Sequence, residues 1–103
     1  MPEEQVYTLL VEVGRKDGDG LPEGATGAAM LCYASGKTEK AAVDATVSVL
    51  RDAGMSPLEV DSYGSRTERE AEGEEISPED AALMDRAAAE NAVVVAQVTT
   101  FQD

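Results

Sequence analysis

Carboxylates are the side chains in this sequence that are numerous enough to do chemistry. The 103 residues include 21 Asp and Glu, eight Lys and Arg, and no histidine. Without histidine the chain has no Ser/His or Cys/His nucleophile pair, and it lacks the usual nitrogen ligands for zinc, copper and non-haem iron. Paired carboxylates can still perform acid and base catalysis if burial separates their pKa values. No such pair stands out, so the sequence favours a non-catalytic role without excluding an enzyme.

Residues 35–38 (SGKT) have the ending of a phosphate-binding P-loop. The full pattern, G-x-x-x-x-G-K-[ST], places backbone amides around the phosphates and needs glycine at position 31. Leu31 stands there instead, at the end of an apolar run. We therefore expect a turn into a helix capped by Ser35 or Thr38, with at most a weak anion site at that helix N-terminus.

Part of a calcium loop is present in four acidic and turn residues, namely Asp17, Asp19, Gly20 and Glu23. A calcium loop begun at Asp17 would need glycine at its sixth position and a carboxylate at its twelfth. Those positions hold Pro22 and Ala28. We therefore expect an ordinary acidic turn between two strands, and we predict no metal site and no cofactor.

The densest charge in the chain is acidic and lies before the last helix. Nine of the 21 acidic residues fall between Glu59 and Asp80. Such a run is usually a solvated loop, but it can also steer a basic partner, or at the extreme imitate nucleic-acid phosphates. The candidate partner-binding residues are Glu68, Glu70, Glu72, Glu74 and Glu75.

Apolar spacing divides the chain into strands and helices. Strand-length runs cover 6–13, 28–34, 58–63 and 92–101, and helical spacing covers 38–53 and 77–91. Gly54 and Pro57 end the first helix, whereas Ser77 caps the second and Pro78 occupies its first position. Between these elements lie two predicted loops, a Gly-rich loop at 14–27 and an acidic mobile loop at 65–76.

The order ββαβαβ predicts an α+β fold, a two-layer α/β sandwich formed by one domain over residues 1–103. Right-handed crossovers favour a four-stranded mixed sheet with both helices on one face, and a ferredoxin-like architecture is a near alternative. Both faces of the first, second and last strands carry apolar residues. The face without helices would then be a large exposed apolar surface, so we predict a homodimer that buries it. In the alternatives, loop 14–27 or the acidic segment folds over the face, or one helix lies on each side.

The charge and the segment composition limit the partners. A net charge of −13 repels the phosphates of DNA, RNA and anionic membranes. No apolar stretch approaches a membrane span, residues 1–4 are acidic where a signal peptide is basic, and the single Cys32 cannot form an internal disulfide. We expect Cys32 to be buried, and we predict a cytoplasmic protein with no direct nucleic-acid or membrane partner.

Two functions from different classes remain. The first is a non-catalytic, homodimeric interaction or regulatory domain whose acidic segment docks a basic partner. The second is a small-ligand sensor or small enzyme with a pocket at the sheet edge or dimer seam, walled by Tyr7, Tyr33 or Tyr63 and closed by the Gly-rich loop. Salt dependence separates them, because steered binding of a charged partner weakens as ionic strength rises.

Overall fold

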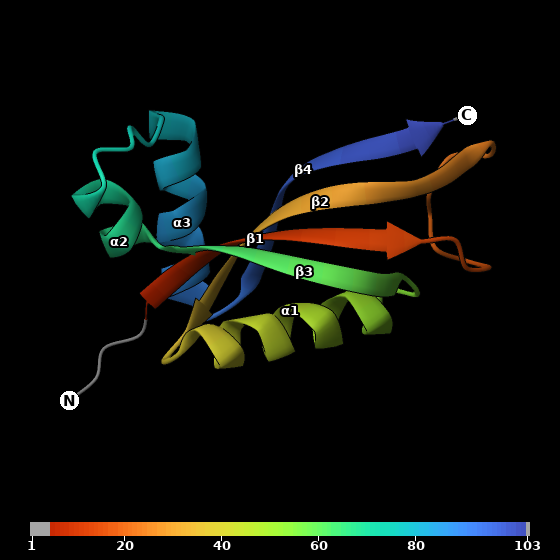
Figure 1. Cartoon of the computed structure of the whole chain (residues 1–103). Helices are drawn as coiled ribbons and strands as arrows, with labels where there is room; N and C mark the ends of the chain where they lie inside the picture. Colours follow the sequence, from red (N-terminus) through yellow and green to blue (C-terminus); the bar gives the residue numbers. More distant parts are fainter. Residues whose placement is uncertain (1–4, 103) are drawn as a thin grey trace.

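Alternating apolar residues produce a long central β hairpin, and the other elements are arranged around it (Figure 1). The computed structural model describes residues 5–102. The strands are β1 (Gln5–Gly14), β2 (Ala25–Gly36), β3 (Ser56–Ser65) and β4 (Val93–Gln102), and the helices are α1 (Glu39–Asp52), α2 (Arg66–Ala71) and α3 (Pro78–Glu90). The predicted α+β sandwich is therefore confirmed, with one helix more than expected.

The sheet has the strand order β3-β1-β2-β4, and all three neighbouring pairs are antiparallel. The expectation of a mixed sheet was wrong. Helix α1 carries the chain back along the sheet, so β3 runs in the same direction as β2. However, β3 lies beside β1 rather than beside β2, and β4 likewise lies beside β2. Each crossover thus delivers its strand to an outer edge next to an antiparallel neighbour.

The long helices lie on opposite faces of the sheet, which corrects the expectation that both cover one face. On one face, Leu9 and Val11 of β1 belong to the core that α1 covers through Ala42 and Leu50. We call this the α1 face. On the other face, which we call the α3 face, Met84 of α3 lies in a separate buried cluster. Its other buried members are Val6, Tyr33 and Ala87.

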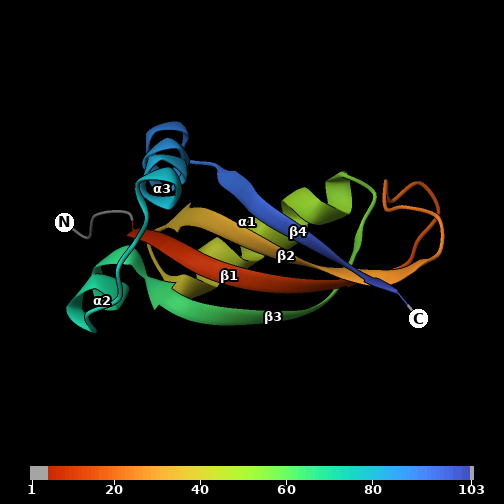
Figure 2. The same ribbon diagram turned by 90° about the horizontal axis from the view of Figure 1, so that it is seen from above.

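Helices α2 and α3 gather at one end of the sheet, and the rest of the α3 face has no helix over it (Figure 2). Helix α2 directly follows β3, and the linker after α2 leads the chain to α3. The open part of the α3 face carries the exposed acids Glu12, Glu59 and Asp61. The argument that predicted a dimer through a bare apolar face therefore loses its premise.

Local signals placed the ends of both long helices correctly. Thr38 Oγ1 accepts a hydrogen bond from Ala41 N at 3.1 Å, and Ser77 Oγ accepts one from Asp80 N at 3.1 Å. Gly54 has φ +86°, and Met55 N donates to Leu50 O at 2.9 Å, which ends α1 as predicted. Residues 35–38 thus form the turn into a capped helix rather than a phosphate loop.

The segment 65–76 is not only a loop, because it contains the helix α2. Ser65 and Glu68 form a capping box, in which Ser65 Oγ accepts from Glu68 N at 3.2 Å and Glu68 Oε1 accepts from Ser65 N at 3.3 Å. Arg66 reduces the repulsion among the acidic residues, because it pairs with Glu70 at 3.3 Å and with Asp85 at 2.7 Å. Charge pairing therefore permits a short helix where a mobile loop was predicted.

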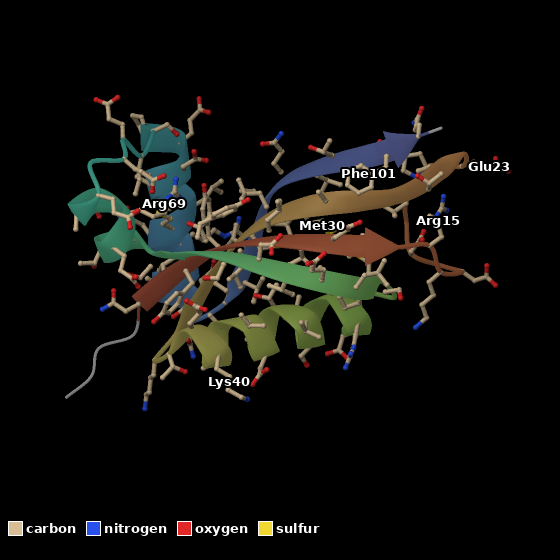
Figure 3. The ribbon with its side chains drawn as sticks, viewed as in Figure 1. Arg15, Glu23, Met30, Lys40, Arg69 and Phe101 are labelled. Carbon is tan, nitrogen blue, oxygen red and sulfur yellow. The ribbon has the colours of Figure 1, made fainter. Side chains whose placement is uncertain are left out.

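The Gly-rich loop is shorter than predicted, since β2 already begins at Ala25. Asp19 is buried in it, and its carboxylate accepts hydrogen bonds from Lys16 N at 2.9 Å, Leu21 N at 3.0 Å and Arg15 Nε at 3.0 Å. These donors make Asp19 an anchor of the turn. The loop lies at the end of the sheet opposite α2 and α3, as the positions of Arg15 and Arg69 in Figure 3 show. It is therefore not a lid over that end.

Candidate functional site

Two adjoining hollows lie on the α3 face, and we call them together the trough. The first has a volume of about 290 Å³ and is lined by Thr8, Leu31, Tyr33, Tyr63, Arg69, Glu74 and Asp80. The second has a volume of about 210 Å³ and is lined by Leu10, Ala29, Leu31, Tyr63, Gln97 and Thr99. Leu31 and Tyr63 border both hollows, so the trough runs from the α2 and α3 end onto the open sheet.

Strand alternation and register build the floor of the trough. Side chains of alternate residues share a sheet face, and cross-strand partners lie side by side. Leu31 of β2 lies opposite Leu10 on one side and opposite Gln97 on the other. Thr8 likewise lies opposite Tyr33. The centre of the floor is therefore apolar, with polar groups towards its ends.

Arg69 closes the polar end. Its Nη1 donates to Thr8 Oγ1 at 2.8 Å, and its Nε donates to Glu74 Oε2 at 2.9 Å. The side chain is only 19% exposed, whereas that of Glu74 is 48% exposed. Arg69 therefore ties α2 and the linker after it to the central strand, and its charge is already paired within the protein.

Tyr33 and Asp80 form the inner wall of the same end. Burial raises the pKa of the Tyr33 hydroxyl, the nearby Asp80 carboxylate raises it further, and the Arg69 guanidinium acts in the opposite direction. Tyr33 is therefore a neutral hydroxyl near pH 7. Within residues 5–102, no Lys or Arg nitrogen lies within ion-pair distance of Asp80. The polar end thus has two carboxylates and one cation, and Asp80 is the carboxylate without a cationic partner.

A second group of acids lies on the open part of the α3 face. Glu12 of β1 and Glu59 of β3 are direct cross-strand partners, and Asp61 lies opposite Leu10. All three acids are exposed, and none takes part in an ion pair within the part of the chain that the structure describes. Like charges opposite each other destabilise a sheet, so this placement has a cost that a bound cation would remove.

The three candidate tyrosines separate by face. Tyr33 and Tyr63 both line the trough, with Tyr33 1% exposed and Tyr63 53% exposed. Tyr7 is buried in the core of the α1 face, in the same cluster as Leu9. The structure therefore brings two of the three tyrosines into one hollow, and alternation along β1 takes the third away from it.

The five candidate glutamates have different surroundings. Only Glu74 lines the trough. Glu68 completes the capping box, Glu70 pairs with Arg66, Glu72 is the C-terminal cap of α2, and Glu75 is exposed. Most of the acidic segment therefore holds α2 in shape, and one of its members faces the candidate site.

Sequence reasoning missed Arg69 as a site residue, and it included Asp80 in the acidic run without naming it as a candidate site residue. The one available signal was an arginine within a run of glutamates, since such a residue is expected to pair with a neighbouring glutamate.

The buried Cys32 lies on the α1 face, away from the trough, and burial raises the pKa of its thiol to about 11. The chemistry that the trough offers is therefore hydrogen bonding and the binding of positive charge.

Within residues 5–102, none of the helices has the length and apolar character needed to cross a membrane. No curated protein and no solved structure matches the chain. A family model with the description Domain of unknown function (DUF8846) matches residues 6–102. The chain therefore belongs to the DUF8846 family.

Proposed function

We propose that the protein is a non-catalytic interaction domain that binds a basic side chain of a partner protein in the trough. The observation that carries this proposal is the charge of the polar end, where Asp80 and Glu74 face one cation, Arg69. Arg69 is occupied by Glu74 and Thr8. The Asp80 carboxylate is thus the group that a lysine or arginine of the partner would pair with.

The floor of the trough suits the rest of such a side chain. Lysine and arginine bury their aliphatic stems on apolar surface while the charged end meets a polar group. Leu31 and the exposed ring of Tyr63 lie beside Asp80 around the same hollow. The stem would pack on Leu31, and a cation near Tyr63 would also gain a cation–π contact.

Charges outside the trough would favour the same class of partner. The net charge of −13 and the acids Glu12, Glu59 and Asp61 create a negative field on the open part of the α3 face. Such a field accelerates association with a basic protein and weakens as salt rises. It also disfavours a dimer in which two α3 faces meet, because the same acids of both copies would be brought together.

A small cationic ligand is the second candidate. It is favoured by Tyr33, whose hydroxyl is buried at the closed end of the trough, where it would suit one small polar group. The trough continues onto open sheet beyond that end, which suits an extended partner better.

The homodimeric state and the cytoplasmic location of the protein also remain predictions.

The test compares substitutions that each remove one negative charge, either inside or outside the trough. Binding of a short oligolysine peptide is measured by calorimetry for the parent protein, Asp80→Asn and its neighbour control Glu79→Gln. Glu79 is exposed and lies outside the trough. We expect Asp80→Asn to weaken binding by about tenfold to a hundredfold, because a charge-assisted contact is worth about 1.5–3 kcal/mol. We expect Glu79→Gln to change binding less than twofold.

Glu74→Gln and Glu75→Gln form a second matched pair within the acidic segment. Only the first should weaken binding, since Glu75 does not line the trough. If all four substitutions weaken binding equally, the peptide responds to net charge alone and the trough is not the site. Butylammonium reproduces the lysine side chain alone, so both candidates predict that Asp80→Asn weakens its binding. Butylammonium binding as tight as that of the peptide would favour the second candidate, whereas much tighter binding of the peptide would favour the first.

A further inference from the structure

The two edges of the sheet differ in how they are protected against pairing with another strand. An edge strand exposes unpaired backbone groups, and proteins block such edges with proline, charged side chains and bulges. The β3 edge carries Pro57, Glu59 and Asp61, and its register against β1 shifts twice. The β3 edge is therefore protected in the usual ways.

The β4 edge has little of this protection. Its ten residues (VVVAQVTTFQ) include no charged residue, no proline and no glycine. Its register against β2 shifts twice, as that of β3 does against β1, but only one of these shifts leaves an additional residue on β4 itself. Three large apolar side chains on it are exposed, Val95 at 41%, Val98 at 47% and Phe101 at 38%. A long, neutral, apolar edge of this kind is a surface for adding another strand.

We infer that β4 pairs with β4 of a second copy of this chain, antiparallel, about a two-fold axis perpendicular to the sheet. Charge limits where a second copy can dock, because two copies that each carry −13 can approach only where the surface between them is neutral. β4 is such a surface over its whole length. Glu90, the nearest described charge before it, is already paired with Arg86 at 2.8 Å.

The bulge in β4 makes the strand complementary to itself. Cys32 lies opposite Val95 and Leu31 lies opposite Gln97, so Ala96 is the additional residue on β4. Val95 and Val98 consequently project to the same face, the α1 face. With the axis between Ala96 and Gln97, Val95 would lie opposite Val98 of the second copy, and both exposed valines would be buried.

This arrangement has a consequence for the trough that rests on the proposed function. A two-fold axis perpendicular to the sheet keeps both α3 faces on the same side of one eight-stranded sheet. Two troughs would then face a partner together, and a partner with two basic sites would gain avidity.

Molar mass tests the seam independently of any ligand. It is measured by light scattering on an eluting size-exclusion peak, over a hundredfold concentration range at low and moderate salt. We expect twice 10.8 kDa, with more dimer at moderate salt because screening reduces the repulsion between copies. Binding of a basic partner in the trough should instead weaken as salt rises. Failure of the dimer proposal is therefore distinguishable from failure of the proposed binding function. A monomer at every concentration would overturn the inference and leave the edge for a strand of another protein.

Matched variants then locate the seam. Val98→Glu should shift the protein to monomer, whereas Leu58→Glu, the same kind of change at a 67% exposed residue of the β3 edge, should leave the dimer intact. A folded Val98→Glu variant that stays dimeric would overturn the β4 seam. If Val98→Glu does not fold, disulfide cross-linking between chains tests the β4 seam instead. Cys32 lies directly opposite Val95, so the cysteine variants also carry Cys32→Ala. A mixture of Val95→Cys and Val98→Cys chains should then cross-link efficiently while each alone should not, and equal cross-linking of all three samples would contradict the register.

Discussion

Arg69 on α2 donates a hydrogen bond from Nη1 to Thr8 Oγ1 on the central strand β1, over 2.8 Å. The same guanidinium pairs with Glu74 in the linker that leads to α3. One side chain therefore fixes the acidic segment against the sheet and completes the polar end of the trough. Arg69 therefore supports the local fold and also lines the proposed binding site.

Replacing Arg69 by alanine should lower the free energy of unfolding by about 1.5–3 kcal/mol, because hydrogen bonds to a largely buried charged group are lost. Amide hydrogen exchange in 66–76 should also increase. Urea denaturation gives the first quantity, and Arg86→Ala is the control. Arg86 makes one exposed ion pair with Glu90 and should contribute less than about 1 kcal/mol. Equal losses for the two arginines would contradict the role given to Arg69.

The titration of Tyr33 reports the electrostatics of the polar end. Burial and Asp80 raise the pKa of Tyr33, and Arg69 lowers it. Asp80→Asn should therefore bring the pKa of Tyr33 closer to that of a free tyrosine, and Arg69→Gln should move it further away. The absorbance of tyrosinate, with Tyr33→Phe to assign the signal, measures both shifts. A Tyr33 pKa that neither variant moves would show that these three side chains do not interact.

Asp19 should make the hairpin loop sensitive to acid. Hydrogen bonds from the Lys16 and Leu21 amides, aided by Arg15, lower the pKa of Asp19. A carboxyl group with a lowered pKa in the folded state stabilises the fold above its unfolded pKa, about 3.9, and this contribution is lost as pH falls through the folded value. Asp19→Asn should thus be less stable than the parent at pH 6, and the difference should shrink below about pH 4. The control is Asp17→Asn, at an exposed residue of the same turn. The same pH dependence of the stability difference for Asp17→Asn and Asp19→Asn would contradict this account.

Gly36 tests the interpretation of residues 35–38 as a turn into α1. A Cβ atom at Gly36 would lie 2.8 Å from Ala42 N and 3.0 Å from Thr38 O, both backbone atoms that cannot move aside easily. Gly36→Ala should therefore cost about 1–3 kcal/mol of unfolding free energy. At Gly14 the nearest atom to a new Cβ is Leu58 Cδ1 at 3.1 Å, the end of a flexible side chain. Gly14→Ala should cost less, and the reverse order in thermal denaturation would refute the packing argument.

The sequence was sufficient to predict those structural features that depend on residues close together in the chain. The caps at Thr38 and Ser77 and the end of α1 at Gly54 involve side chains within a few positions of each helix terminus. Helix α2 was missed because the run of acidic residues was interpreted as a solvated loop without considering the ion pairs of Arg66 and Arg69.

The face covered by each helix and the composition of the trough depend on contacts distant in sequence. Thr8 meets Tyr33 through the hairpin register, and Arg69 reaches Thr8 because α2 follows β3, which lies beside β1. Alternation together with the hairpin register separates Tyr7 from Tyr33, but it does not say which face α3 will take. Tyr7, Tyr33 and Tyr63 were proposed as pocket walls, and only Tyr33 and Tyr63 line the trough. The contribution of Asp80 and Arg69 required the topology.

The most direct test of the binding trough is a titration of the isotopically labelled protein with oligolysine, followed by amide and side-chain NMR shifts. The account predicts saturable changes concentrated at Leu31, Tyr63 and Asp80, and their loss in Asp80→Asn. The exposed acids of α1, such as Asp44 and Asp52, should show only small changes. Shifts spread evenly over all exposed carboxylates, or concentrated on α1, would contradict the claim that the trough binds a basic group.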